Sequence, residues 1–133
     1  MRTTDVAAAV IKKEGKYLIA RRKEEKHLGG KWEFPGGKIN EDETAKQCLE
    51  RELEEELGIA VKIGNFIAEG YYSDDTISIR LLGYLAELIS GQLKLNAHDE
   101  IRWVKAGELM NFDFAEADLP IVIEIVKYSF DAD

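Results

Sequence analysis

Apolar residues occur along this chain in short runs separated by polar or glycine-containing segments, a pattern typical of strands joined by turns. The run at residues 6–11 is apolar throughout and predicts a buried strand. With the run at residues 17–20, which follows a polar turn at 12–16, it predicts a hairpin. The predicted strands are residues 6–11, 17–20, 32–34, 59–67, 76–88 and 101–104.

Polar and turn-forming residues fill the intervals between these runs. Residues 21–31 are polar and carry a glycine pair near their end, so we expect a loop there. Pro35-Gly36-Gly37 ends the short third strand, and residues 73–75 form a turn between two later strands. We expect residues 93–100 to be mostly loop and residues 105–110 to form a short helical turn.

One segment, residues 43–57, has the periodicity of a helix. Leucines recur in it every four residues and form an apolar stripe that faces the core. Gly58 follows the last leucine directly, in the position where a left-handed residue ends many helices. The stripe consists of Leu49, Leu53 and Leu57, with Ala45 at its margin.

A second helix is predicted from about residue 120 to residue 130. Pro120 suits its first turn, and apolar residues follow at helical spacing. Strands and helices are mixed here without regular strand–helix–strand alternation, so we predict an α/β fold of the α+β kind, a mixed β-sheet packed between α-helices. The apolar positions expected to face the core are Leu119, Val122, Ile123, Val126 and Phe130.

The length of 133 residues fits one core, so we expect a single domain spanning residues 1–133. No apolar run approaches the roughly 20 residues that cross a bilayer. The N-terminus lacks the pattern of a secretory signal. Cys48 is the only cysteine, which excludes an internal disulfide. These features predict a cytoplasmic protein that does not bind membranes.

Acidic residues outnumber basic ones. There are 18 lysines and arginines against 26 aspartates and glutamates, which gives a net charge of −8. An acidic surface repels a nucleic-acid backbone and no basic stripe is present, so the sequence argues against a nucleic-acid polymer as partner. A small phosphorylated ligand would also be repelled unless bound cations reversed the local field.

The acidic residues are dense at the end of the first predicted helix. Glu54, Glu55 and Glu56 occupy its last turn, where the helix dipole favours cations, and Glu52 and Glu56 form a like-charge pair. Helical geometry places Glu52, Glu55 and Glu56 on a surface about 110° from the leucine stripe. Three carboxylates on one surface suit a divalent cation such as Mg²⁺. The alternative is a solvated helix face.

Residue spacing around this helix matches a known motif. Gly37, Glu43 and residues 51–59 (RELEEELGI) are spaced as in the Nudix box, which residues 37–59 resemble in full. Residues 32–38 (WEFPGGK) resemble the strand and turn that precede this box in MutT-like members. The chain therefore resembles the MutT-like branch of the Nudix hydrolase family. The resemblance implies the Nudix fold, in which a mixed β-sheet is sandwiched between α-helices.

By position, the resemblance implies that Glu52, Glu55 and Glu56 hold a divalent metal ion, with the Gly37 carbonyl as a further ligand. The expected ion is Mg²⁺, with Mn²⁺ able to replace it, and such an ion lowers the pKa of an attacking water. The general base is one of these glutamates or a carboxylate from another loop, because clustered carboxylates titrate as a set. Arg51, in the same catalytic group, is expected to hold a glutamate by a charge-assisted hydrogen bond.

Other residues in and beyond the motif have predicted structural or metal-binding roles. Glu43 is expected to anchor the junction before the helix, and Cys48 to pack in the core. Many relatives take one more metal-binding carboxylate from the loop before the late strand. Glu100 is our choice for it, followed by Asp99, and the alternative for both is an ordinary polar loop residue.

Candidate substrate contacts come from three separate regions. Asp118 occupies the place where MutT-like proteins carry an asparagine or aspartate that contacts the base, and its alternative role is to cap the final helix. Phe34 would stack on the base, and its alternative is a core position. Arg22 would bind phosphate or sugar bidentately, and its alternative is an exposed arginine. His27, beside the same region, is a further candidate.

The resemblance implies a Mg²⁺-dependent nucleoside triphosphate pyrophosphohydrolase, which releases a nucleoside monophosphate and pyrophosphate. The expected substrates are (deoxy)cytidine triphosphates or oxidised deoxyguanosine triphosphate, which such enzymes remove before polymerases use them. The alternatives are an ADP-ribose or nucleotide-sugar pyrophosphatase and a non-catalytic nucleotide-binding Nudix domain. We expect a small nucleotide as the partner, and a monomer or homodimer.

Overall fold

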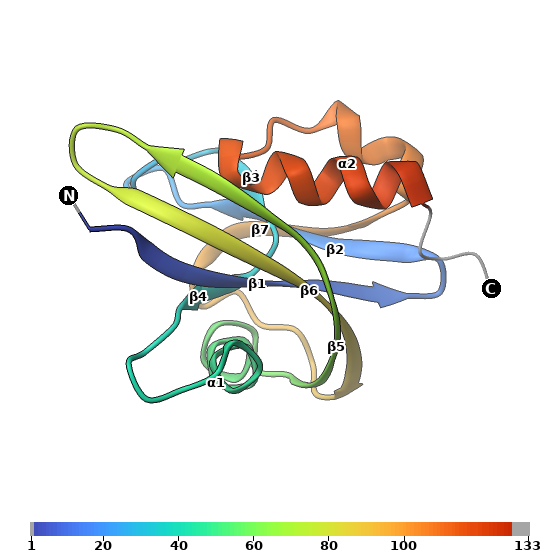
Figure 1. The fold of residues 1–133 in the computed structure, drawn as a ribbon. Coiled ribbons are helices and arrows are strands. Elements are labelled where there is room, and N and C mark those ends of the chain that lie inside the picture. The colour runs from blue at the N-terminus through green and yellow to red at the C-terminus, as the bar shows by residue number, and fades with distance from the viewer. Residues whose placement is uncertain (1, 129–133) are drawn as a thin grey trace.

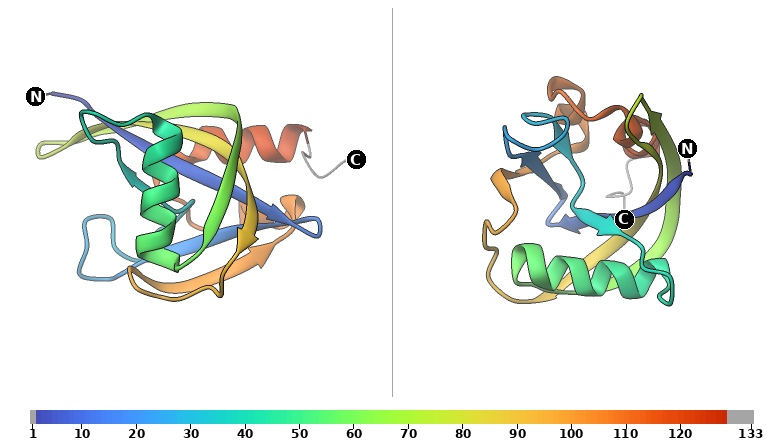
Figure 2. Two further views of the ribbon diagram at one scale, coloured as in Figure 1. Left: turned by 90° about the horizontal axis from the view of Figure 1, so that it is seen from below. Right: turned by 90° about the vertical axis from the view of Figure 1, so that its left-hand side faces the viewer.

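The computed structural model describes residues 2–128. A seven-stranded sheet forms its middle layer, and helices α1 and α2 lie on opposite sides of it (Figures 1 and 2). The strands are β1 (Thr4–Lys13), β2 (Lys16–Arg22), β3 (Trp32–Glu33), β4 (Gly36–Lys38), β5 (Ala60–Ser73), β6 (Ser78–Ser90) and β7 (His98–Val104). The helices are α1 (Ala45–Leu57), α2 (Leu119–Tyr128) and the 3₁₀ helices η1 (Ala106–Asn111) and η2 (Glu116–Asp118).

Strand β1 is paired on both of its edges. It runs parallel to β6, from Thr4 opposite Ile79 to Lys12 opposite Glu87, and antiparallel to β2 and β4. Strand β5 pairs antiparallel with β6, and β7 pairs antiparallel with β2. One parallel pair among antiparallel ones confirms the predicted mixed sheet.

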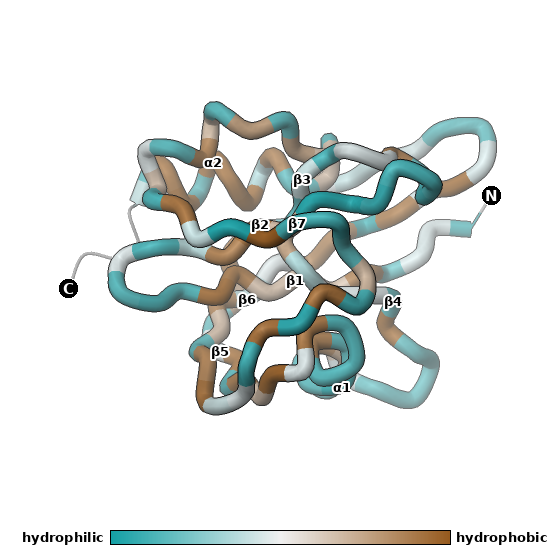
Figure 3. Tube along the Cα trace, turned by 180° about the vertical axis from the view of Figure 1, so that it is seen from behind, coloured by the Kyte–Doolittle hydropathy of each residue, from teal (hydrophilic) through white to brown (hydrophobic). Residues whose placement is uncertain are grey.

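The predicted first strand is buried on both faces, which explains why its apolar run shows no alternation. Ala8 and Val10 face the apolar cluster beneath α2, whereas Ala7, Ala9 and Ile11 face the cluster beneath α1. All five side chains are fully buried. Apolar positions gather along the strands, and polar positions gather in the connecting loops (Figure 3).

Helix α1 carries the glutamates of the motif, and local signals set both of its ends. Thr44 caps the N-terminus: its side chain accepts from Gln47 N, while the Gln47 side chain accepts from Thr44 N. The helix therefore begins at Ala45, two residues later than predicted. Gly58 ends it in the predicted left-handed conformation, with φ of 70°. The predicted leucine stripe is confirmed, since all three leucines are fully buried.

The glycines after the third strand form a strand of their own, which corrects the predicted turn. Gly36 lies opposite Ala8 in the pairing of β4 with β1. A Cβ on Gly36 would lie 1.9 Å from the carbonyl oxygen of Ala7, so this close pairing requires glycine.

Several strands are longer than predicted. Strands β1 (Thr4–Lys13) and β2 (Lys16–Arg22) extend beyond the predicted residues 6–11 and 17–20, and β5 and β7 are also longer. Strand β5 continues to Ser73, beyond the predicted end at residue 67, because it pairs with β6 to its last residue. Strand β7 begins at His98, where we expected loop, because His98 pairs with Arg22 of β2. The β7 extension is polar throughout and the β5 extension contains no large aliphatic side chain, so the apolar pattern did not predict them.

Helix α2 buries a different face from the predicted one. Ile121, Val122 and Ile125 are fully buried, whereas Ile123 is 54% exposed. Leu119 and Val126 are also exposed, so of the predicted stripe only Val122 faces the core, and Phe130 lies outside the described residues. The segment is apolar on nearly all sides, so its spacing alone did not define the buried face. Among residues 2–128, no helix is long and apolar enough to cross a membrane.

Candidate active site

Gly37 of β4 and Glu52 of α1 are in direct contact. Pairing with Ala7 holds Gly37 in place, and Cys48 Sγ of α1 lies 3.4 Å from the Gly37 carbonyl oxygen. A Cβ on Gly37 would lie 2.3 Å from Glu52 Cδ, so the carboxylate fills the space that any other residue would need. The fold thus brings a candidate carbonyl ligand and a candidate carboxylate ligand together.

We expect Gly37→Ala to lower kcat more than it lowers stability. The added Cβ meets the far end of a flexible side chain, so Glu52 moves while the backbone stays in place. A displacement of about 1 Å in a catalytic group costs on the order of 100-fold in rate, whereas the cost in unfolding free energy is about 1 kcal/mol. Turnover assays and urea denaturation of the variant measure the two effects.

Gly36→Ala is the matched comparison because its Cβ meets backbone, at 1.9 Å from the Ala7 oxygen. Here the strand pairing itself has to yield, and we expect a loss of about 3 kcal/mol in unfolding free energy. If Gly37→Ala were as unstable as Gly36→Ala, or kept wild-type turnover, the assigned contact with Glu52 would be wrong.

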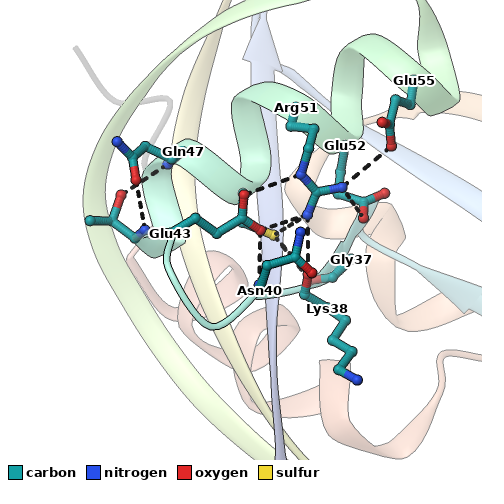
Figure 4. A network of polar contacts seen from close by, with 10 residues as sticks. Gly37, Lys38, Asn40, Glu43, Gln47, Arg51, Glu52 and Glu55 are labelled. Carbon is teal, nitrogen blue, oxygen red and sulfur yellow. Dashed lines mark hydrogen bonds and ion pairs between the residues drawn. The ribbon is translucent and has the colours of Figure 1, made fainter.

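Arg51 is surrounded by carboxylates (Figure 4). It donates to Glu43 twice, from Nη2 to Oε1 at 2.6 Å and from Nε to Oε2 at 3.1 Å. Its Nη1 also donates to Glu52 Oε2 at 3.0 Å and to Glu55 Oε1 at 3.4 Å. The predicted hydrogen bond to a glutamate is present, and it extends to three of them. One cation therefore offsets much of the repulsion within this group.

Glu43 joins the loop before α1 to this arginine. Asn40 N donates to Glu43 Oε1 at 2.9 Å, so the carboxylate fixes the loop as well as Arg51. The hydrogen bond from Arg51, followed by that from Asn40, lowers the Glu43 pKa to about 2. Glu43 is accordingly ionised at neutral pH and anchors the junction, as the sequence predicts.

Glu56 is part-buried, and its pKa is raised, in contrast to that of Glu43. Its Oε1 is buried and has no hydrogen-bond partner among the described residues. Burial raises the Glu56 pKa to about 7, opposed by His98 and reinforced by the charges of Glu52, Glu33 and Glu55. An unpartnered buried carboxylate oxygen has a high desolvation cost, which a bound cation would offset.

Two residues of the site, Glu33 and His98, were not singled out from the sequence. His98 is 4% exposed, and its Nε2 lies 2.9 Å from Glu33 Oε2. Arg22 Nη1 donates to Glu33 Oε1 at 3.0 Å. Strand alternation was a usable signal for Glu33, because the buried neighbours Trp32 and Phe34 place it on the opposite face. His98 gave no such signal, since its segment was expected to be loop.

Asp118 is 4% exposed, and its Oδ2 accepts from Phe34 N at 3.0 Å. Burial and the nearby Glu33 hold its pKa well above the usual range. The bond to Phe34 accounts for this carboxyl without a role in capping α2. Phe34 itself is 2% exposed and stacks on Phe114, with ring centroids 5.4 Å apart, so it is a core residue as well as a wall of the cavity described next.

A cavity of about 310 Å³ brings the candidate residues of different regions together. Gly37 and Glu56 of the motif line it, as do Phe34 and Asp118. Arg22 and His27 line it from the loop side. A second cavity of about 80 Å³ shares Arg22, Glu33 and Glu56 with the first and adds His98. Two of the candidate metal ligands, Gly37 and Glu56, therefore border the same space as the candidate base contacts, whereas Glu52 and Glu55 do not line it.

Glu100 and Asp99, the two candidate carboxylates from the region before the late strand, do not line the 310 Å³ cavity. Glu100 Oε2 accepts from Arg102 Nε at 2.5 Å, and Asp99 forms an ion pair with Arg21 at 3.9 Å. Neither carboxylate lines a cavity beside Glu56. The metal-ligand role of Glu100 stays a prediction, and it requires this side chain to leave Arg102.

Cys48 lies beneath the motif and packs against it. The side chain is fully buried, and burial raises the thiol pKa to about 12, with Glu43 adding to the effect. A thiol that stays protonated at neutral pH is a poor nucleophile. The packing role predicted from the sequence agrees with this environment.

A mixed sheet lies between two helices, and the glutamate-rich helix α1 packs against strand β4, which contains Gly36 and Gly37. This is the architecture of a Nudix hydrolase. Residues 1–125 match the family model described as NUDIX domain. The chain belongs to the Nudix family.

Similar proteins come from the MutT-like part of this family. The chain is 34% identical to the CTP pyrophosphohydrolase of Escherichia coli, over 92% of the chain and 90% of that protein. It is 30% identical to the 8-oxo-dGTP diphosphatase of Escherichia coli, over 96% of the chain and 99% of that protein. Among solved structures, the E. coli ORF135 protein superposes with a TM-score of 0.82 at 32% identity, over 100% of the chain and 96% of that chain.

Nudix hydrolases generally need a divalent metal ion. We therefore asked whether the oxygen atoms of the motif suit such an ion. Among residues 2–128, no three acidic, histidine or cysteine side chains are arranged to hold an ion as they stand. The reason is visible in the contacts, because Glu52 and Glu55 both bond to Arg51. The donor set still suits Mg²⁺: it offers carboxylate oxygens, the Gly37 carbonyl and the unpartnered buried Oε1 of Glu56. The residues fit the ion.

Proposed function

We propose that this chain is a Mg²⁺-dependent nucleoside triphosphate pyrophosphohydrolase, which hydrolyses a nucleoside triphosphate to a monophosphate and pyrophosphate. The observation that carries the proposal is the 310 Å³ cavity, because Gly37 and Glu56 border it together with Phe34 and Asp118. A largely preformed cavity with a few convergent polar groups is typical of a small-molecule site. The names of the two E. coli relatives support the same substrate class.

Each motif residue has a role in this proposal. Glu52, Glu55, Glu56 and the Gly37 carbonyl hold the ion, which when bound neutralises phosphate charge and lowers the pKa of a water. Arg51 holds Glu52 and Glu55 in position from the other side. A carboxylate of this set acts as the general base.

Three residues serve the nucleotide. Asp118 contacts the base from the buried end of the cavity wall, and Phe34 supplies an aromatic surface beside it. Arg22 binds phosphate or sugar. Its guanidinium is already oriented by two hydrogen bonds, to Glu33 Oε1 at 3.0 Å and to the His27 carbonyl at 2.8 Å. Such preorganisation lowers the entropic cost of binding.

The reaction and its substrate are tested together. We expect Mg²⁺-dependent release of pyrophosphate from a panel of CTP, dCTP, 5-methyl-dCTP, 8-oxo-dGTP and dGTP, with Mn²⁺ supporting a lower rate. The best triphosphate should exceed ADP-ribose in kcat/KM by at least about 100-fold, because the proposed substrate is a nucleoside triphosphate and the two E. coli relatives are named for such substrates. Release of orthophosphate from the triphosphates, or a preference for ADP-ribose, would overturn the assignment.

We also propose that residues 1–133 act as one domain whose box spans residues 37–59, as a monomer or a homodimer. Cytoplasmic location and the lack of a nucleic-acid polymer partner stay predictions from the sequence. Sedimentation velocity at micromolar protein distinguishes the two oligomeric states.

A further inference from the structure

The loop between β2 and β3, residues 23–31, reaches the cavity from one side. His27 and Leu28 of this loop line the cavity, and Tyr72 and Ile77 at the end of the β5–β6 hairpin line it as well. Two segments far apart in the sequence therefore meet at the same space.

A direct polar contact joins these segments. His27 Nε2 lies 3.1 Å from Asp74 Oδ2. The His27 ring also meets the Tyr72 ring edge-on, with centroids 6.2 Å apart and planes at 62°. The loop is thus attached to the hairpin by one polar side-chain contact and one aromatic contact.

Asp74 is held in place by its own turn, whatever the loop does. Its Oδ1 accepts from Thr76 N and Thr76 Oγ1, both at 2.8 Å, and from Ile77 N at 3.0 Å. Tyr72 OH donates to the other oxygen, Oδ2, at 2.8 Å. These bonds, led by those from the Thr76 and Ile77 amides, hold the Asp74 pKa well below its usual range. The hairpin presents a fixed, ionised acceptor to His27.

The loop side of the contact has an unusual backbone conformation. Leu28 has φ of 57°, an unfavourable conformation for a leucine, and Gly30 has φ of 83°. Arg22 at the base of the loop donates from Nε to the His27 carbonyl at 2.8 Å. The His27 carbonyl is therefore one of two acceptors that orient the Arg22 guanidinium, and Glu33 Oε1 is the other.

We propose that His27 and Asp74 form a latch that closes the 23–31 loop over the cavity, and that closure positions Arg22 for the nucleotide. His27 is a positioning residue, because it acts through the loop and Arg22. The nucleotide part rests on the proposed function, whereas the latch itself is a property of the fold and can be measured without substrate.

Limited trypsin digestion tests the latch alone, because the loop contains Lys23 and Lys26. We expect His27→Ala and Asp74→Asn to raise the rate of cleavage in the loop by about 10-fold, since protease attack follows the population of the open segment. His27→Gln, whose amide donates to the same carboxylate, should recover most of the protection. Thr76→Val is the matched control, because it removes a hydroxyl bond to the Oδ1 oxygen and leaves the His27 contact intact.

Steady-state kinetics test the consequence for the substrate. With the triphosphate of highest kcat/KM in the panel above, we expect His27→Ala and Asp74→Asn each to raise KM about 10-fold, with kcat changed less than about 3-fold. The double variant should be no worse than either single one, because both remove the same contact. A purely structural role would instead lower the melting temperature and leave the two changes additive.

The two readouts separate the possible failures. Loop cleavage at the wild-type rate in both variants would overturn the latch, whatever the kinetics show. Faster cleavage with unchanged KM and kcat would overturn the positioning of Arg22. If the wild-type protein hydrolysed none of the panel, the proposed function would fail, and the cleavage rates would still decide for or against the latch.

Discussion

Glu56→Gln should reduce kcat by at least about 10³-fold with Mg²⁺ while making the metal-free protein more stable than wild type at pH 8. The loss of rate follows because a neutral amide replaces a charged ligand of the ion. The gain in stability follows because Glu56 is ionised inside the protein, where its Oε1 has no partner among the described residues. Substitution by an uncharged side chain of equal size removes that cost.

The stability gained by Glu56→Gln should grow as the pH rises. The Glu56 pKa is about 7 in the folded protein, above its ordinary value of 4.5. Between these two values the folded state binds the proton more tightly than the unfolded state, so wild-type stability falls as the pH rises from 4.5 to 7. The cost is absent below pH 4.5 and complete above pH 7. With the partial exposure of the side chain discounted, it amounts to about 2 kcal/mol.

Thermal unfolding with and without Mg²⁺ measures both effects. Without metal, the melting temperature of Glu56→Gln should exceed that of wild type at pH 8 and equal it near pH 4. Added Mg²⁺ should stabilise wild type more than the variant. Glu54→Gln is the matched control, since Glu54 is an exposed residue of the same helical turn. Wild-type turnover in Glu56→Gln would refute the metal assignment, and a lower metal-free melting temperature would refute the buried-charge argument.

Arg51→Met should lower both stability and activity, with kcat reduced about 100-fold. The substitution keeps an unbranched apolar stem and removes the guanidinium with its charge. Glu43, Glu52 and Glu55 then lose their shared cation and repel one another. Without Arg51, Glu52 is no longer held beside Gly37, so the candidate ligands lose their geometry.

Acid titration distinguishes this role from simple packing. The folded-state pKa of Glu43 is about 2, below its ordinary 4.5, so this group stabilises the fold above pH 4.5 and loses that effect as the pH falls towards 2. The difference in melting temperature between wild type and Arg51→Met should therefore be largest above pH 4.5 and narrow towards pH 2. Lys46→Met, at an exposed position on the same helix, is the control. A difference that did not change with pH would contradict the charge argument.

Local patterns predicted the helix that carries the motif. Leu49, Leu53 and Leu57 are all fully buried, and Gly58 has the left-handed conformation expected of it. These features depend on residues close together in the chain, so their spacing was informative. Helix α2 shows the opposite case. It is apolar on nearly every side, and its buried face was chosen by packing against the sheet.

Longer-range pairing decided which polar residues share the site. Glu33 and His98 meet across 65 residues of sequence, and Phe34 and Asp118 across 84. Both contacts depend on strand register and on the path of the chain over the sheet. Glu100, which the sequence favoured, bonds to Arg102, whereas the neighbouring His98 reaches the interior. Regular alternation would place these two residues on the same face, because they are two positions apart. The register shift between β2 and β7, which pairs Arg21 with Glu100 and Arg22 with His98, breaks the alternation between them.

The sequence by itself determined the family and placed three glutamates on one surface of α1, because the helical repeat is a property of the local chain. The tertiary structure decided what each glutamate faces. Glu52 lies against Gly37, Glu55 bonds to Arg51, and Glu56 lines the cavity. Burial raises the Glu56 pKa, and the buried Oε1 has no hydrogen-bond partner among the described residues. That burial arises when α1 packs on a sheet whose pairing joins distant segments, which no local pattern encodes.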